Sequence, residues 1–83
     1  MTRAEIIIKV NYFLVNDIEI NETILQNSEA KLKDDLGIDS LDFVDIVVIV
    51  ERNFGFKIKP EEMANVETLA QFYDYVEMKV NEN

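Results

Sequence analysis

The sequence predicts an all-α fold: a small bundle of three main helices plus one short helix, with a long loop after the first helix. Three long segments repeat their apolar residues at helical spacing, and none shows the sustained alternation of a strand. Capping-box patterns stand at the starts of these segments. The 83 residues suffice for one small hydrophobic core. We therefore expect residues 1–83 to form one domain, ordered from about residue 2 to residue 80 and frayed after that.

The first helix is expected from about Thr2 to Asn16. Thr2 and Glu5 have the spacing of a capping box, in which each side chain binds the backbone N–H of the other residue. Four apolar residues then share one face, which predicts that this face lies in the core: Ile6, Val10, Phe13 and Leu14.

A long loop is expected from Asp17 to Leu32, because asparagine and serine residues interrupt the helical spacing there. Five aliphatic side chains are available to hold this loop against the core: Ile18, Ile20, Ile24, Leu25 and Leu32. A structureless loop of this length is unusual in so small a domain unless it has a purpose.

The second helix is expected from about Ser40 to Phe54, with Gly55 as its C-terminal stop. Asp39 and Ser40 are both favourable N-cap residues, and Asp42 follows Asp39 at capping-box spacing. The predicted core face consists of Phe43, Val47, Val50 and Phe54. The opposite face consists of Leu41, Asp45, Val48 and Arg52, with Val44 and Ile49 beside it. The apolar middle also fits a buried strand, but the length and the capping signals favour a helix.

Two further helices complete the prediction. Pro60 suits the first turn of a short helix that continues from Glu61 to about Asn65. Thr68 and Gln71 form another capping box and open the last helix. Its predicted inward residues are Leu69, Phe72, Tyr73, Val76 and Val80.

The charge is strongly acidic, with a formal net charge of −9. Six acidic residues and no basic one lie between Asp34 and Glu51, which concentrates negative potential around Ser40. Such a field repels nucleic acid and anionic membranes and attracts basic protein surfaces. The absence of cysteine suits a reducing cytoplasm. No metal site is expected, because histidine is absent and the acidic residues lack the spacing of a calcium loop.

The segment leading into the second helix resembles the acyl carrier proteins of fatty-acid and polyketide synthesis. The resemblance rests on Leu36-Gly37-Ile38-Asp39-Ser40-Leu41-Asp42, followed by Val44, Asp45, Glu51 and Phe54. In that family the serine carries a covalent 4′-phosphopantetheine arm derived from coenzyme A, whose thiol holds acyl groups as thioesters. The resemblance implies that Ser40 is the attachment site, with Asp39 and Leu41 beside it, and that the long loop is a family feature.

The resemblance also implies partners and a cargo site. Carrier proteins present their second helix to a phosphopantetheinyl transferase and to acyl-processing enzymes with basic docking surfaces. The matching recognition residues are Asp39, Leu41, Asp42, Val44, Asp45, Val48 and Glu51. The implied acyl pocket is lined by Phe43, Val47, Val50, Val66 and Phe72. We expect a monomer in the cytoplasm, without nucleic acid or membrane as a partner.

Two departures from the family pattern bear on the cargo and the partners. The second helix ends in Glu51-Arg52-Asn53, where family members are often acidic throughout. Phe43 and Phe72 stand where smaller residues are frequent near the acyl pocket, which favours a short or polar cargo, or an acyl group left exposed. This argues against bulk fatty-acid elongation and keeps a specialised pathway open.

The sequence argues against an enzyme. A serine nucleophile needs an adjacent base, and the chain has neither histidine nor cysteine. Lysines such as Lys57 and Lys59 lie at distant positions in the sequence. The alternative function is an acidic helical protein-interaction module without a prosthetic group, in which Ser40 serves only as a helix cap.

Overall fold

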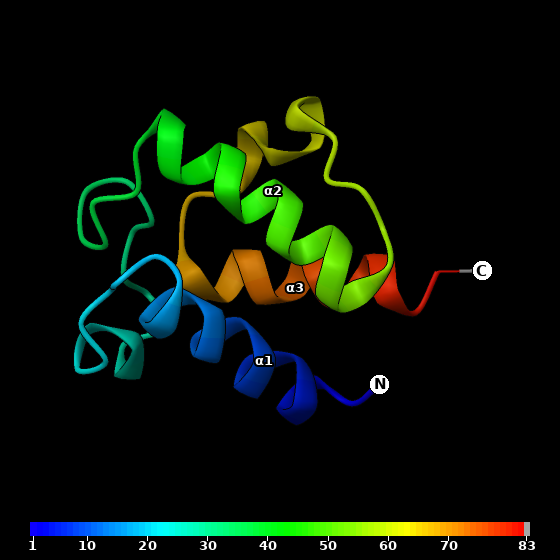
Figure 1. The fold of residues 1–83 in the computed structure, drawn as a ribbon. Coiled ribbons are helices and arrows are strands. Elements are labelled where there is room, and N and C mark those ends of the chain that lie inside the picture. Colours follow the sequence, from blue (N-terminus) through cyan, green and yellow to red (C-terminus); the bar gives the residue numbers. More distant parts are fainter. Residues whose placement is uncertain (83) are drawn as a thin grey trace.

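Three α-helices and two short 3-10 helices follow one another along the chain in the computed structural model, which describes residues 1–82 (Figure 1). They are α1 (Arg3–Asn16), η1 (Ile24–Gln26), α2 (Ser40–Phe54), η2 (Pro60–Asn65) and α3 (Leu69–Val80). Within the described residues the sole β-type pairing is one isolated bridge between Lys31 and Thr68. The predicted all-α class, with three main helices and a short one, is confirmed.

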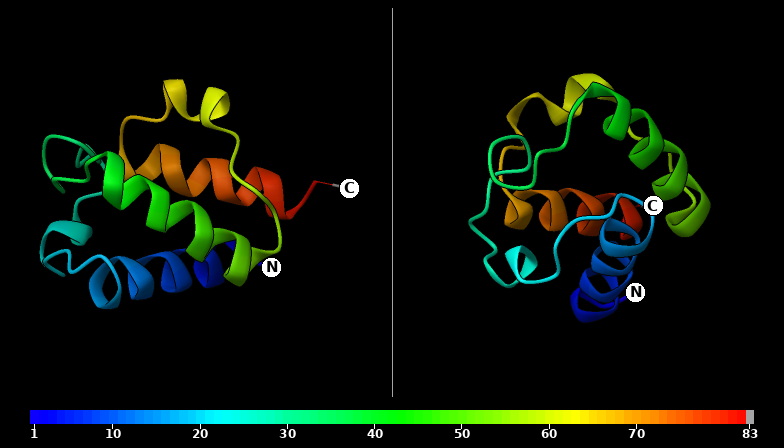
Figure 2. Two further views of the ribbon diagram at one scale, coloured as in Figure 1. Left: turned by 45° about the horizontal axis from the view of Figure 1, so that its top comes forward. Right: turned by 60° about the vertical axis from the view of Figure 1, so that its left-hand side comes forward.

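The helices enclose the core from three sides. α1 and α3 lie side by side, and α2 crosses α3 obliquely, with η2 beside the N-terminal half of α2 (Figures 1 and 2). The N-terminus and the C-terminal end of α3 lie at one end of the bundle, whereas the long loop and the start of α2 lie at the other (Figure 1). Ser40 therefore stands at the loop end, away from both termini.

Each main helix begins with a capping box. The Thr2 and Thr68 hydroxyls accept the N–H groups of Glu5 and Gln71, as predicted. In α2 the cap is Asp39, whose carboxylate accepts the N–H of Asp42. Ser40 is the first residue inside the helix, so the role of helix cap that the alternative function assigned to it is wrong. Gly55 ends α2 in the left-handed conformation, with φ +78°, for which glycine is suited.

The core of α1 and α3 matches the prediction closely. All four predicted α1 residues are buried, and α3 buries Leu69, Phe72, Tyr73 and Val76 together with Tyr75, which the sequence analysis did not include. Val80 is half-buried. In α2 the buried residues are Ile46 and Val50, while Phe43, Val47 and Phe54 pack at the edge of the core. The buried face of α2 therefore includes Ile46, which the prediction left out, and its centre lies closer to Ile46 than the centre of the predicted face.

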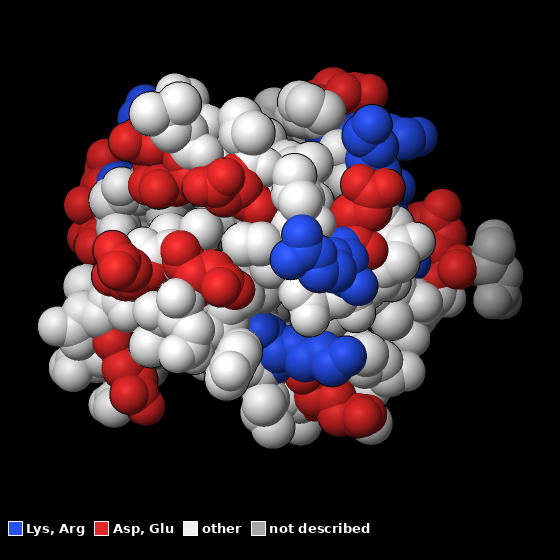
Figure 3. All heavy atoms as spheres, in the orientation of Figure 1, with Lys and Arg blue, Asp and Glu red and all other residues white. Residues whose placement is uncertain are grey.

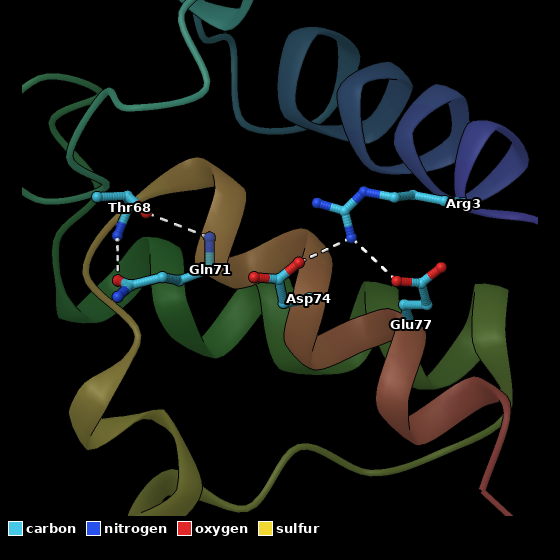
Figure 4. Close-up of polar contacts among 5 residues, drawn as sticks. All are labelled: Arg3, Thr68, Gln71, Asp74 and Glu77. Carbon is cyan, nitrogen blue, oxygen red and sulfur yellow. Dashed lines mark hydrogen bonds and ion pairs between the residues drawn. The ribbon is translucent and has the colours of Figure 1, made fainter.

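Polar contacts tie α1 to α3. Arg3 Nη1 lies 2.8 Å from Asp74 Oδ1 and 3.0 Å from Glu77 Oε1 (Figure 4). The guanidinium carbon of Arg3 also lies 6.0 Å from the centre of the Tyr73 ring, and the Tyr73 hydroxyl donates to Asn11. The N-terminal half of α1 is therefore held to α3 by charge as well as by apolar packing.

The connecting segment after α1 runs to Asp39 and is longer than the predicted loop. Ile20 and Leu25 are buried, Ile18, Ile24 and Leu32 are half-buried, and η1 forms one unpredicted turn. Backbone hydrogen bonds from Leu69 to Ala30 and from Leu32 to Glu67 fix this segment to the start of α3. At the other end, Asn81 caps α3, and the last residue of the predicted frayed tail, Asn83, lies outside the described residues.

Candidate functional site

Ser40 is an exposed side chain at the first position of α2. The capping box beside it occupies both neighbouring carboxylates: Asp42 N–H donates to Asp39 Oδ1 at 2.8 Å, and Asp39 N–H donates to Asp42 Oδ2 at 3.2 Å. Among the described residues the Ser40 hydroxyl makes no hydrogen bond to the protein, so its oxygen is open to an external group.

The turn before Ser40 is held in place from both sides. Ile38 N–H donates to Leu32 O at 3.0 Å, and Leu36 N–H donates to Lys31 O at the same distance. Gly37 between them has φ +73°, a left-handed conformation that glycine adopts without strain. Leu36 is buried. The segment therefore presents Ser40 from a fixed backbone rather than from a loose loop.

The backbone around Ser40 can accommodate a phosphodiester. The first N–H groups of a helix have no intrahelical acceptor, and in the described part of the chain neither Ser40 N–H nor Leu41 N–H finds another. Free amides at a helix N-terminus favour an anionic phosphate. An exposed hydroxyl beside two free amides thus fits the attachment of a phosphate-linked group, although the carboxylates of Asp39 and Asp42 add opposing charge.

The outward face of α2 is apolar at its centre and acidic around it. Leu41, Val44 and Val48 expose 75%, 59% and 50% of their surface, respectively. The predicted acidic residues Asp39, Asp45 and Glu51 are exposed, and Asp42, which makes the capping bonds with Asp39, is half-buried. All the predicted recognition residues thus lie at the start of α2 or along its outward side. Exposed apolar residues surrounded by charge are typical of a surface that a partner covers.

A small apolar cavity lies between α2, η2 and α3, close to the attachment end. Its volume is about 30 Å³, and it is lined by Leu14, Leu32, Ile38, Phe43, Ile46, Met63 and Phe72. That volume holds about one or two water molecules, so an acyl chain can enter only if lining side chains move. Ile38 stands two residues before Ser40, which places one wall of the cavity next to the serine.

The cavity contains only part of the predicted acyl-pocket set. Phe43 and Phe72 line it, but Val47, Val50 and Val66 do not. Val50 is completely buried in the core, and Val66 lines a separate surface hollow beside Lys31. Five lining residues were absent from the predicted set: Leu14, Leu32, Ile38, Ile46 and Met63. For Ile46 the signal was its position three residues after Phe43, which places both on neighbouring parts of one helix face.

Polar side chains fasten η2, which supplies Met63 to the cavity, to α3. Glu62 Oε2 lies 3.0 Å from Lys79 Nζ, and Glu62 Oε1 accepts the Tyr75 hydroxyl at 2.8 Å. The hydrogen bonds from Lys79 and Tyr75 lower the pKa of Glu62 below its usual value. Burial, together with the bond to Glu62, raises the pKa of Tyr75. These contacts hold the wall of the cavity that η2 supplies against α3.

Other kinds of site find no support in the described residues. No group of three or more acidic, histidine or cysteine side chains there is arranged to hold a metal ion. No helix within residues 1–82 combines the length and the apolar character needed to cross a membrane. Ser40 is flanked by carboxylates engaged in capping rather than by a base aimed at its hydroxyl.

Comparison with known proteins places these features in a family. The family described as the phosphopantetheine attachment site matches residues 15–76. The chain is 37% identical to the acyl carrier protein of Thermotoga maritima over 79 residues, covering 95% of this chain and 96% of that protein. It is also 37% identical to the acyl carrier protein of Chlorobium phaeovibrioides and 35% identical to that of Chlorobium phaeobacteroides, covering 95% of this chain and all of each relative.

Proposed function

The chain belongs to the acyl carrier protein family, and from this premise we propose that Ser40 is the residue to which the phosphopantetheine arm is attached. The protein is a carrier rather than an enzyme, and its prosthetic group is 4′-phosphopantetheine. When bound, that group supplies a thiol that holds acyl groups as thioesters.

The exposed, unbonded hydroxyl of Ser40 carries this proposal. The chain has one other serine, Ser28, which lies in the long loop and not at a helix start. In the transfer, Ser40 Oγ bonds to the phosphorus of coenzyme A that bears the pantetheine, the pyrophosphate P–O bond breaks, and adenosine 3′,5′-bisphosphate leaves. The free N–H groups of Ser40 and Leu41 at the helix start favour the phosphodiester charge that results. Asp39 keeps this helix end formed through its bond to Asp42. The base that removes the serine proton comes from the transferase, because the capping carboxylates are engaged.

The proposed recognition surface is the outward face of α2. Its exposed apolar centre, Leu41, Val44 and Val48, offers area that a partner can bury. The surrounding acids Asp39, Asp42, Asp45 and Glu51 are placed to attract a basic docking surface. The expected partners are a phosphopantetheinyl transferase and acyl-processing enzymes.

The small cavity supports a short or polar cargo. Phe43 and Phe72 line a space of about 30 Å³, less than a long acyl chain needs. We therefore favour a specialised biosynthetic pathway over bulk fatty-acid elongation. The net charge of −9 supports the further proposals that nucleic acid and anionic membranes are not partners. Monomeric state and cytoplasmic location stay predictions.

Mass spectrometry tests the attachment directly. The protein is incubated with coenzyme A and a broad-specificity phosphopantetheinyl transferase, in parallel with Ser40→Ala and the matched control Ser28→Ala. We expect the wild type and Ser28→Ala to gain the mass of one arm and Ser40→Ala to gain none. Modification of Ser40→Ala would show that the site is wrong, and no modification of any variant would favour an interaction module without a prosthetic group.

A further inference from the structure

Two neighbouring hollows mark a seam between α1 and the C-terminal half of α2. The first has a volume of about 340 Å³ and is lined by Asp17, Asp45, Val48, Ile49, Arg52 and Asn53. The second has a volume of about 200 Å³ and is lined by Ile8, Lys9, Tyr12, Phe13, Asp17 and Asn53. Asp17 and Asn53 line both hollows, so the seam is continuous from α2 to α1.

Neither cation of the seam forms an ion pair of 4.0 Å or less within the described residues, although Lys9 interacts at longer range with Glu5, one turn earlier on α1. Lys9 and Arg52 are exposed, and the ion pairs there involve only Arg3 and Lys79 as the basic members. Lys9 Nζ instead lies 5.9 Å from the centre of the Phe54 ring, at the end of α2. Both cations are therefore available to an anionic group from outside.

The sign of the charge changes with distance from Ser40. At about 1.5 Å per helical residue, Asp45 lies about 8 Å and Arg52 about 18 Å along α2 from the serine. Asp17 shares a hollow with Asp45. Figure 3 shows most acidic side chains gathered towards the loop and the N-terminal half of α2, and basic side chains, with some acidic ones beside them, over α1 and the C-terminal half of α2. Glu51, an exposed acid in that C-terminal half, lines neither hollow.

We propose that this seam docks partner enzymes that place a carboxylate against Arg52 and Lys9 and a basic side chain against Asp45 and Asp17. Two contacts of opposite sign fix the orientation of the partner, and a like-charge contact disfavours a wrong one. Arg52 and Lys9 then determine specificity, because a uniformly basic docking surface meets repulsion at this end of the seam. The inference rests on the proposed function, since it takes the partners to be acyl-processing enzymes.

The first experiment uses a probe enzyme with a uniformly basic carrier-docking surface, a bacterial β-ketoacyl synthase whose docking residues are lysine and arginine. Its kcat/KM is measured with the wild-type carrier, Arg52→Glu, Lys9→Glu and the control Lys57→Glu, all bearing the same acyl group. Lys57 is exposed and lines neither hollow. Because all three variants replace one basic residue with glutamate, they have the same net charge.

We expect Arg52→Glu and Lys9→Glu to raise kcat/KM about three- to fivefold at low ionic strength, the size typical of exposed charge pairs. The gain should fade at high salt, because screening weakens contacts between exposed charges. An equal gain for Lys57→Glu would show an effect of net charge alone, and no gain for either seam variant would show that the seam does not contact the enzyme. Either result would overturn the proposal.

The second experiment reverses charges on the enzyme. Each docking lysine of the synthase is changed to glutamate in turn and assayed with wild-type carrier and with Arg52→Glu. At one position or more, the change to glutamate should raise kcat/KM with the wild-type carrier and lower kcat/KM with Arg52→Glu. An equal fall of kcat/KM for both carriers at every position would contradict the proposal. Attachment of the arm is verified by mass before the kinetics. Absence of the arm refutes the proposed function, whereas normal attachment without a charge preference refutes only the docking inference.

Discussion

Glu62 of η2 and Lys79 of α3 form an ion pair, with 3.0 Å between Oε2 and Nζ, that fastens the wall of the small cavity to the third helix. Only 13% of the Lys79 side chain is exposed, so the pair is partly shielded from water. Tyr75 donates a second bond to the same carboxylate. Met63 follows Glu62 and lines the cavity, which makes this pair a candidate control point for cavity opening.

The Glu62 contacts predict a pH-dependent stability. The folded-state pKa of Glu62 lies below its usual value, chiefly because of the bond to Lys79. The contribution of the Glu62 carboxylate to the free energy of unfolding is therefore complete above the unfolded-state pKa of about 4.3. This contribution is lost as the pH falls through the folded-state pKa. Glu62→Gln should lower the melting temperature at pH 7, and its difference from the wild type should shrink below about pH 4.

Thermal melting between pH 3 and pH 7 measures this difference. Glu61→Gln is the matched control, because Glu61 is the exposed neighbour on the same short helix and has no bond to α3 within the described chain. If the difference in melting temperature between the wild type and Glu62→Gln stays constant down to pH 3, the charge of the Glu62 carboxylate does not contribute to stability.

The start of α2 predicts different costs for adjacent substitutions. Asp39→Ala removes the cap and should lower the free energy of unfolding by about 1 kcal/mol, whereas Asp39→Asn keeps a capping oxygen and should change it little. Ser40→Ala should fall within about 0.5 kcal/mol of the wild type, because Ser40 is not the cap. Urea denaturation measures all three. If Ser40→Ala lowers the free energy of unfolding as much as Asp39→Ala does, the assignment of Asp39 as the helix cap is wrong.

Local signals account for what the sequence predicted well. Caps such as Thr2 with Glu5 and Thr68 with Gln71 act over three residues, and helical spacing identified the buried faces of α1 and α3. The choice between Asp39 and Ser40 as cap was local too, but both residue types suit that position, and only the backbone geometry distinguishes them.

The cavity and its fastening depend on packing between distant segments. Met63 and Ile38 meet Phe72 only once η2 and the long loop have folded against α3. The contact of Arg3 with Glu77 spans 74 positions, and neither residue carries a local sign of its partner. Sequence periodicity thus predicts which face of a helix is buried but not which side chains from other elements complete the site.

Substitutions in the proposed recognition surface of α2 are expected to affect transferase kinetics with two different salt dependences. Asp45→Lys should slow attachment of the arm by the transferase more at low than at high ionic strength, because salt screens the attraction between exposed charges. Val48→Ala should weaken the same reaction with little salt dependence, because it removes apolar contact area. Transferase kinetics at several salt concentrations check both.

The control for Asp45→Lys is Glu29→Lys, which makes the same change in net charge on the long loop. Equal slowing by Asp45→Lys and Glu29→Lys would mean that the acidic face serves general repulsion and solubility. The docking surface would then have to lie elsewhere on the molecule.

The packing of Phe43 and Phe72 predicts a coupling between stability and cargo. Phe72 is 2% exposed, so Phe72→Ala should lower the free energy of unfolding by about 3–5 kcal/mol. The same change enlarges the cavity between Leu14, Ile46 and Met63. A medium-length acyl chain on the arm should therefore raise the melting temperature of Phe72→Ala more than that of the wild type. Phe13→Ala is the control, because Phe13 is equally buried but lies outside this cavity.

Melting temperatures of the carriers with a bare arm, a medium acyl chain and a long acyl chain give the answer. If filling the cavity is the cause, Phe13→Ala will lose stability without gaining more than the wild type from the acyl chain. Strong stabilisation of the wild type by a long acyl chain would mean that the lining side chains move aside readily. The aromatic pair would then not limit the cargo, and ordinary fatty-acid synthesis would account for the protein better than a specialised pathway.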